Sequence, residues 1–480
     1  MITASEYRRR LFGMRHNIHI GGDLVGRDDP RIEQPINVVA TTFDMAGQAE
    51  NAGVATATSH LSCQKINRFC NIHRSVEDLL MKQKMTRMEC HRAGVCIQRC
   101  MGIDAMNALS IATYDTDQKY GTEYNSRFLK FLEYFQKEDV VANCAQTDVK
   151  GDRSKRPHEQ ADPDLYLRIV ERKSDGIVVR GAKAHNTIAP YAEELIVLPT
   201  RALTAEESDW AVAFAIPADT EGIHQIVRIA NVRPRKHLKA PIATVGDAES
   251  MTVFDNVFIP WERVFLCGET DMGGKLALLF ANYHRHSYTG CKPATTDIIM
   301  GAAALAADYN GIGSAQHVKT KLGYLIGIAE LVNAAGIAAA VNAEKTPSGT
   351  FTPNPTFVNV GRRLAGENIF HEWEVLCDLA GGIYATLPFE EDWYNETTRG
   401  YLEKYIMRNP RVSAENQHRL FRMIGDLMAS SYAGVELAGQ YHGGGSPIME
   451  TIGLINTYNI NAKKDLVKYL AGIPLEDPHD

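Results

Sequence analysis

The sequence contains no uninterrupted apolar run of the roughly 18 to 20 residues that would span a membrane. Its first ten residues, Met1 to Arg10, are too charged and too poor in apolar side chains to form a signal peptide. We therefore expect a cytoplasmic protein that has no membrane partner.

An excess of positive charge is also missing. Lys and Arg number 51 against 58 Asp and Glu, and the formal net charge is −7. Nucleic acids and anionic membranes select basic surfaces, so neither is expected as a partner. No G-x-G-x-x-G motif follows a strand-like run, which argues against a Rossmann-type dinucleotide site.

Nine cysteines are present, an odd number in a chain without a secretion signal, so a disulfide framework is not expected. Most of them should be small buried hydrophobic residues. The nine are Cys63, Cys70, Cys90, Cys96, Cys100, Cys144, Cys267, Cys291 and Cys377.

The 480 residues are too many for one compact core, so two or three domains are expected. Apolar residues recur at helical spacing from 59 to about 114, strand-like runs follow the polar stretch that begins at 147, and helical periodicity returns after 271. This order predicts a multidomain α+β protein with an N-terminal helical domain (1–146), a central β domain (147–270) and a C-terminal helical bundle (271–480).

The stretch from Tyr283 to Lys292 is dense in groups that move protons or bind metals. His284 and Cys291 share a face if this stretch is one helix, and Cys96 and Cys100, four residues apart, would do the same upstream. Either pair alone is more often structural than ligating. Together they make a Cys3His set, which suits zinc or an iron–sulfur cluster.

Two segments resemble the cluster-binding segments of the 4-hydroxybutyryl-CoA dehydratase family: Cys96-Ile-Gln-Arg-Cys100 and Tyr283-His284-Arg-His-Ser-Tyr288-Thr-Gly-Cys291-Lys292. The resemblance extends over nearly the whole chain, including Asp175-Gly-Ile-Val-Val-Arg-Gly-Ala-Lys-Ala-His185. It implies an acyl-CoA dehydrogenase-like fold, FAD, a [4Fe-4S] cluster and a homotetramer (or homodimer). Reduced-flavin aromatic monooxygenases of the same superfamily lack the cluster cysteines.

The resemblance also implies roles for individual residues. The metal ligands would be Cys96, Cys100, His284 and Cys291, and His284 would act as a base once it is released from iron. Glu249, Tyr288 and Lys292 match family positions beside the active site, although the local sequence of Glu249 alone favours a solvated loop carboxylate. Residues expected at FAD are Thr147, Lys150, Asp152, Arg153, His185, Asn186 and Thr187.

The acid–base set departs from the family pattern. The dehydratases carry a glutamate three residues before the His of a His-Gly-x-Gly-Ser-Pro motif, and Gly439 stands at that position here. Glu436, one helical turn earlier, could replace it, and His286 stands where the family has a glutamine. The glycines that follow His442 are expected to form a turn.

The leading hypothesis is an FAD- and [4Fe-4S]-dependent dehydratase of a 4-hydroxyacyl-CoA such as 4-hydroxybutyryl-CoA, with vinylacetyl-CoA isomerase as a related activity. One alternative is a reduced-flavin aromatic monooxygenase whose cysteines are structural, and another is a related cluster-containing dehydratase with a different substrate. A non-catalytic protein with a structural zinc is a further alternative.

Overall fold

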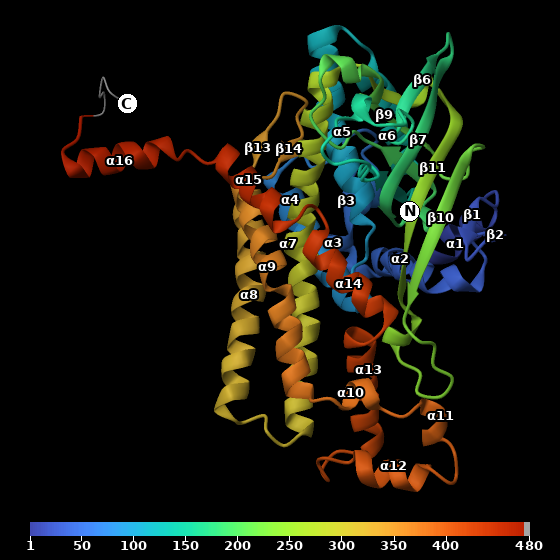
Figure 1. Ribbon diagram of the computed structural model, residues 1–480, viewed down its shortest axis with the longest axis vertical. Helices are drawn as coiled ribbons and strands as arrows, with labels where there is room; N and C mark the ends of the chain where they lie inside the picture. The colour runs from blue at the N-terminus through green and yellow to red at the C-terminus, as the bar shows by residue number, and fades with distance from the viewer. Residues whose placement is uncertain (475–480) are drawn as a thin grey trace.

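The computed structural model describes residues 1–474, and its β-sheets lie to one side of the long C-terminal helices (Figure 1). The multidomain α+β class is confirmed. The helices of the first part of the chain are α1 (Ala4–Phe12), α2 (Glu33–Gly47), α3 (Ala52–Ala55), α4 (Val76–Ala93), α5 (Cys100–Tyr120) and α6 (Tyr124–Lys137).

The larger sheet has six strands in the order β2-β1-β10-β11-β7-β6. Its long members β7, β10 and β11 are antiparallel, and β1 pairs in parallel with β10. Strands β1 and β2 precede residue 147, so the sheet also draws on the N-terminal part of the chain. The bounds are β1 (Ile18–Ile20), β2 (Asp23–Val25), β6 (Arg168–Arg172), β7 (Gly176–Thr187), β10 (Ile223–Asn231) and β11 (Gly246–Pro260).

A four-stranded sheet, ordered β12-β9-β8-β5, packs against the larger one. Alternate side chains of β7 and β11, such as Val179 and Phe254, meet Leu195 and Phe214 of the second sheet in one buried core. The bounds are β5 (Ala142–Ala145), β8 (Glu194–Val197), β9 (Val212–Pro217) and β12 (Val264–Cys267). Two short hairpins lie outside these sheets: β3 (Thr56–Thr58) with β4 (Lys65–Asn67), and β13 (Glu344–Lys345) with β14 (Phe351–Thr352).

Three long helices stand side by side in the C-terminal part, namely α7 (Thr270–Tyr309), α8 (Gln316–Val341) and α9 (Pro355–Ala380) (Figure 1). By length and composition α8 could cross a membrane, a property that core helices of soluble proteins share, and here it packs along α7 and α9. The remaining helices are α10 (Ile383–Thr386), α11 (Glu390–Trp393), α12 (Arg399–Ile406), α13 (Ala414–Met428), α14 (Ser431–His442), α15 (Pro447–Thr457) and α16 (Asn461–Ala471).

One expectation about helices needs correction. The stretch 59–114 is not one helix, because α4 ends at Gly94 in a left-handed conformation (φ 78°) and α5 begins only at Cys100. Helix α7 continues for 40 residues through Pro293, so His284 and Cys291 do lie on one helix. Packing of α7 against α4, α5, α8 and α9 outweighs the hydrogen bond that proline cannot donate.

Candidate active site

Four thiols and one imidazole converge where α4, α5 and α7 meet. Cys96 lies in the loop between α4 and α5, Cys100 is the first residue of α5, and Cys291 and His284 share one face of α7. Cys90, at the end of α4, was not foreseen as part of this group, yet it joins the other three cysteines in one buried cluster. The predicted Cys3His set is therefore brought together, with an additional thiol beside it.

Cys96 does not reach this place by helical spacing. The loop that carries it turns at Gln98, whose φ is +59°, and Gln98 accepts a hydrogen bond from the hydroxyl of Tyr191. Tyr191 also lies 3.5 Å from Asp247 of β11. These contacts fasten the cysteine loop to the larger sheet.

The thiols are electrostatically unequal. Burial raises the pKa of Cys90 and Cys100 well above the ordinary range. The pKa of Cys291 is raised by its contact with Cys96 and by burial. The pKa of Cys96 is lowered instead, because the thiols of Cys291 and Cys90 both donate toward its sulfur. The hydrogen bonds among these buried thiols thus converge on the sulfur of Cys96.

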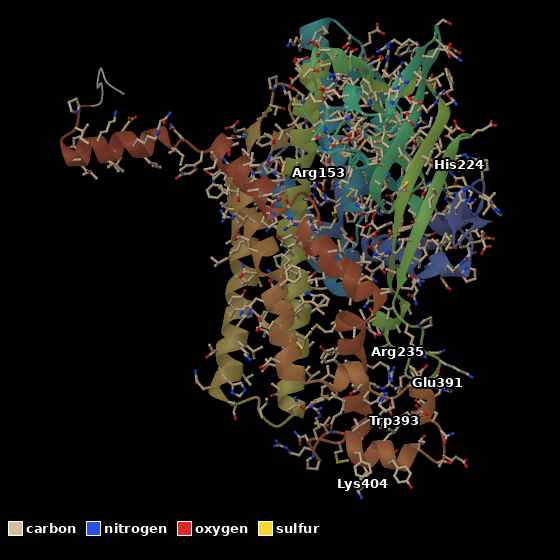
Figure 2. All side chains as sticks on the ribbon, in the orientation of Figure 1. Arg153, His224, Arg235, Glu391, Trp393 and Lys404 are labelled. Atoms are coloured by element: carbon tan, nitrogen blue, oxygen red, sulfur yellow. The ribbon has the colours of Figure 1, made fainter. Side chains whose placement is uncertain are left out.

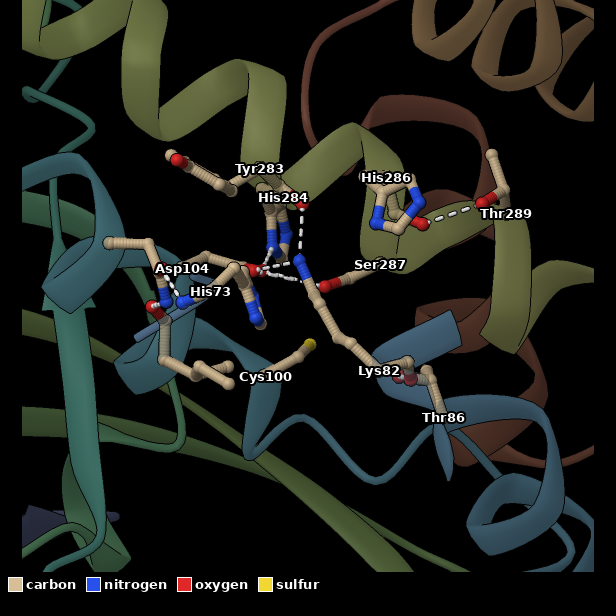
Figure 3. Close-up of polar contacts among 12 residues, drawn as sticks. His73, Lys82, Thr86, Cys100, Asp104, Tyr283, His284, His286, Ser287 and Thr289 are labelled. Carbon is tan, nitrogen blue, oxygen red and sulfur yellow. Dashed lines mark hydrogen bonds and ion pairs between the residues drawn. The ribbon is translucent and has the colours of Figure 1, made fainter. Parts of the chain in front are cut away.

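Asp104 is the buried centre of the polar contacts behind His284 (Figure 3). Its Oδ2 lies 3.0 Å from His284 Nδ1, and its Oδ1 accepts from Lys82 Nζ at 2.5 Å. The hydroxyl of Ser287 lies 3.1 Å and 2.9 Å from the two carboxylate oxygens. With Nδ1 engaged, Nε2 is the imidazole nitrogen left for a metal.

Sequence reasoning missed Asp104, although a signal was present. Asp104 follows Cys100 by four residues, so both face the same way at the start of α5. The ligand atoms of Cys100, Asp104 and His284 lie within 4.8 Å of one another. A search for acidic residues one turn beyond the second cysteine would have found it.

Tyr288 and Lys292 lie in the middle of α7 and not at an exposed helix end. The ring of Tyr288 packs edge-on to His284 at 5.2 Å between centroids, and its hydroxyl donates to the carbonyl of Gly439 at 3.3 Å. Lys292 is fully buried, and its ammonium donates to Glu372 at 2.7 Å. Tyr288 is therefore beside the imidazole, whereas the charge of Lys292 is paired with α9.

The glycines after His442 form a turn, as expected, and the turn covers the site. A β-carbon at Gly444 would stand 3.5 Å from His284 Cδ2. Two buried arginines hold the carbonyls of this turn. Arg285 donates to Gly444 at 2.8 Å, and Arg362 donates to Gly443 at 2.7 Å and to Tyr441 at 2.9 Å. Arg362 also lies over the ring of Tyr288, 4.6 Å from its centroid.

Glu249 is not the solvated loop residue that its local sequence favours. It lies on β11 opposite Thr187 of β7, whose hydroxyl donates to Glu249 Oε1 at 2.7 Å. Its other oxygen, Oε2, is buried without a partner among the described residues. Burial, followed by the charge of Asp247, raises the pKa of Glu249 to about 8. The structure thus joins one predicted catalytic residue to one predicted flavin residue.

The other residues expected at FAD lie on β7 and in the loop that follows β5. His185 is exposed near Lys150 and His442, whose charges add to desolvation in lowering its pKa. Asn186 is buried and donates to Thr252 at 2.8 Å, so its side chain points away from that face. Thr147 is half-buried, and Lys150, Asp152 and Arg153 are exposed (Arg153 is labelled in Figure 2).

Glu436, a residue of α14, lies close to the thiols. Burial and the charge of Cys96 raise the pKa of Glu436 to about 7. Its carboxylate accepts from Tyr432 at 2.9 Å and from Gln440 at 2.6 Å, and it lines a cavity of about 20 Å³. By contrast, His286 faces α8, where it lies 3.3 Å from the carbonyl of Gly336.

Comparison with known proteins finds relatives that match this chain over nearly its full length. Two family models match it: 4-hydroxyphenylacetate 3-hydroxylase N terminal over residues 3–266 and C terminal over residues 274–472. A 4-hydroxybutyryl-CoA dehydratase/vinylacetyl-CoA-Δ-isomerase from Clostridium aminobutyricum is 38% identical over 98% of this chain and 100% of that protein. The 4-hydroxyphenylacetate 3-monooxygenase oxygenase component of Thermus thermophilus is 27% identical over 76% of each chain.

Among solved structures, too, a 4-hydroxybutyryl-CoA dehydratase is more similar to this chain than a 4-hydroxyphenylacetate 3-monooxygenase. An oxygen-tolerant archaeal 4-hydroxybutyryl-CoA dehydratase from N. maritimus superposes with a TM-score of 0.95 at 37% identity, over 99% of this chain and 96% of that one. An oxygenase component of 4-hydroxyphenylacetate 3-monooxygenase, complexed with FAD and 4-hydroxyphenylacetate, superposes with a TM-score of 0.88 at 24% identity, over 98% of both chains.

Proposed function

Since the chain belongs to the family that includes 4-hydroxybutyryl-CoA dehydratase and the 4-hydroxyphenylacetate 3-hydroxylases, we propose that it is a hydro-lyase that removes water from a 4-hydroxyacyl-CoA such as 4-hydroxybutyryl-CoA. The observation that carries this proposal is the convergence of Cys96, Cys100, Cys291 and His284. The monooxygenase relatives are more distant in sequence. The name of the Clostridium relative makes vinylacetyl-CoA isomerisation a second reaction to assay.

The donor set fits a [4Fe-4S] cluster. Three cysteine sulfurs and one imidazole nitrogen are ligands that iron–sulfur centres accept. They come from two helices and a loop that are packed together and surrounded by apolar side chains. In our proposal Cys96, Cys100, Cys291 and His284 Nε2 hold the cluster.

The face of β7 and β11 that carries His185, Thr187 and Glu249 fits FAD. The buried oxygen Glu249 Oε2 lacks a hydrogen-bond partner among the described residues, so this face offers an acceptor or donor for another group. The oxygenase with TM-score 0.88 was solved with FAD. We propose that Thr147, Lys150, Asp152 and Arg153 contribute from the adjoining loop.

When bound, the flavin would supply one-electron redox chemistry, and the iron–sulfur cluster would supply a Lewis acid for a leaving hydroxyl. The residues of the chain then have separate tasks. His284 would serve as the base for a substrate proton only when its Nε2 is not bound to iron, since the same lone pair makes both bonds. Tyr288 Oη lies beside that imidazole and would exchange its 3.3 Å hydrogen bond to the Gly439 carbonyl for one to the substrate hydroxyl.

Two carboxyl groups flank this centre. Glu249 is protonated at neutral pH because its pKa is about 8, so it serves as a hydrogen-bond donor. Glu436, with a pKa of about 7, can exchange a proton at working pH and takes the role of the glutamate that Gly439 replaces. Lys292 is paired with Glu372 and joins α7 to α9 behind the site. Any proton that Lys292 exchanges therefore passes through this ion pair.

Our proposal extends to the assembly. Apolar side chains remain exposed along α8, α15 and α16, and surfaces of this kind mark contacts between subunits. We propose that the protein is a homotetramer (or homodimer) in the cytoplasm. We also propose that its three domains, 1–146, 147–270 and 271–480, are arranged as in acyl-CoA dehydrogenases. The exposed residues are Ile326, Leu331, Ile337, Val341, Ile448, Met449, Ile452, Ile455, Leu466, Val467, Tyr469 and Leu470.

Anaerobic purification tests the proposal. We expect a brown protein with about four irons and one flavin per chain, which converts 4-hydroxybutyryl-CoA within a panel of hydroxyacyl-CoA thioesters. A colourless protein that contains zinc would contradict the cluster and the activity together. A yellow, iron-free protein that hydroxylates phenols with reduced flavin would identify a monooxygenase instead.

A further inference from the structure

Lys82 of α4 makes two buried contacts that meet at His284. Its ammonium donates to Asp104 Oδ1 at 2.5 Å and to the carbonyl of Tyr283, the residue before His284, at 2.8 Å (Figure 3). The side chains of Lys82 and Asp104 are 1% and 0% exposed, so neither charge is hydrated by solvent. One cation therefore fixes both the carboxylate behind the imidazole and the turn of α7 that carries it.

These contacts join every element that supplies a metal-binding side chain. Helix α4 ends in the loop with Cys96, α5 begins at Cys100 and carries Asp104, and α7 carries His284 and Cys291. Ser287, one turn after His284, donates from α7 to the same carboxylate at 2.9 Å. The polar group is thus a cross-link between the two halves of the donor set.

A stabilising role alone does not account for this arrangement. A buried ion pair gains little stability over apolar residues of the same volume, because both charges lose their hydration. The pair does, however, determine which imidazole nitrogen carries hydrogen. A carboxylate at Nδ1 requires an N–H there and leaves the lone pair on Nε2.

We infer that Lys82 and Asp104 are positioning residues that hold His284 in the tautomer and orientation needed for ligation through Nε2. This inference rests on the cluster of the proposed function. Lys82 has a second effect, since its positive charge cancels that of Asp104 beside the thiols. Asp104 itself is no ligand in this assignment, because its oxygens are committed to Lys82, His284 and Ser287.

The test compares the double variant Lys82→Met/Asp104→Leu with the wild-type holoenzyme, because leucine branches at the same carbon as aspartate and has no acceptor for His284 Nδ1–H. The double variant removes both charges together and leaves no unpaired ion. The matched control is Arg263→Met/Glu194→Gln, which removes an ion pair between the residue just before β12 and a residue of β8. Each protein is labelled with 15N-histidine, reduced, and measured for iron content, circular dichroism and the 15N hyperfine coupling of the cluster.

We expect the wild-type and control proteins to show 15N hyperfine coupling between the cluster and the labelled histidine. The double variant should retain a native circular dichroism spectrum and most of its iron through the three cysteines, but lose most of the coupling. An unchanged coupling would overturn the inference, and so would loss of iron with the coupling intact, which would make Asp104 a ligand. Wild-type protein without iron or coupling would instead refute the proposed function.

Ser287→Ala provides a second measurement if the double variant does not fold. This change keeps the ion pair and removes one donor to Asp104. We expect a weaker or broadened histidine coupling at unchanged iron content. A coupling identical to that of wild type would count against the inference.

Discussion

A β-carbon added at Gly443 would lie 1.5 Å from the hydroxyl oxygen of Tyr288. The turn after α14 is thus in direct contact with the candidate active site, and its lack of a side chain is a steric requirement. At Gly439, by contrast, no atom of residues 1–474 outside its own helical turn lies within 4 Å of an added β-carbon. Two glycines four residues apart therefore tolerate substitution very differently.

We expect Gly443→Ala to displace Tyr288 or the turn and to lower dehydratase turnover by about a hundredfold, the scale of a misplaced catalytic geometry. Gly439→Ala is the matched control, with turnover close to wild type. Steady-state kinetics and thermal unfolding of both variants provide the measurement. Equal activity of the two variants would show that the turn does not constrain Tyr288.

Arg362 holds the same turn from the opposite side. Its guanidinium bonds the carbonyls of Gly443 and Tyr441, a geometry that a single ammonium cannot reproduce. We expect Arg362→Lys to loosen the turn, raise its sensitivity to limited proteolysis and lower turnover by about tenfold, since a hydrogen bond to a charged group contributes about 1.5–3 kcal/mol. The control change Arg363→Lys, at the half-buried neighbouring residue, should leave both properties unchanged.

Glu436 is the candidate for the acid–base role that the family assigns to the position of Gly439. If it has that role, Glu436→Gln should lower dehydration by about 10² to 10⁴-fold while leaving iron and flavin content unchanged. Because a side chain at position 439 has room, Gly439→Glu in the Glu436→Gln background should restore part of the activity. Unchanged turnover of Glu436→Gln would remove this residue from the mechanism.

The parts of the site that depend on helical periodicity were predictable, and those that depend on tertiary contacts were not. His284 and Cys291 share a face because α7 continues, and periodicity shows this directly. Cys96 reaches the same place through a loop whose path is set by Gln98, Tyr191 and the sheet, and no local pattern contains that information. The burial of Glu249 likewise arises from strand pairing with residue 187, 62 positions away.

Cys90 is close to the donor set but lies outside it in our proposal. We expect Cys90→Ala to retain about four irons per chain, whereas Cys96→Ala should lose most of the iron and the brown colour. The cluster spectrum and reduction potential of Cys90→Ala should shift, because hydrogen bonds to a ligand sulfur tune an iron–sulfur centre. Loss of iron from Cys90→Ala would make Cys90 a ligand.

Glu249 makes the stability of the protein depend on pH. Its pKa is about 8 in the folded protein and near the ordinary value of 4.5 once the chain unfolds. The folded state therefore binds a proton that the unfolded state releases, so the contribution of Glu249 is fully present below pH 4.5 and is lost as pH rises through about 8. A glutamine has the same shape as the protonated acid and does not titrate.

We expect the unfolding temperature of Glu249→Gln, relative to wild type, to rise between pH 5 and pH 9. Other groups that titrate in this range, such as Glu194, are common to both proteins and cancel in the difference. Thermal unfolding of the two proteins side by side measures it. A difference that stays constant across this range would mean that Glu249 is ionised in the folded protein at neutral pH, and it would then be a base instead of a hydrogen-bond donor.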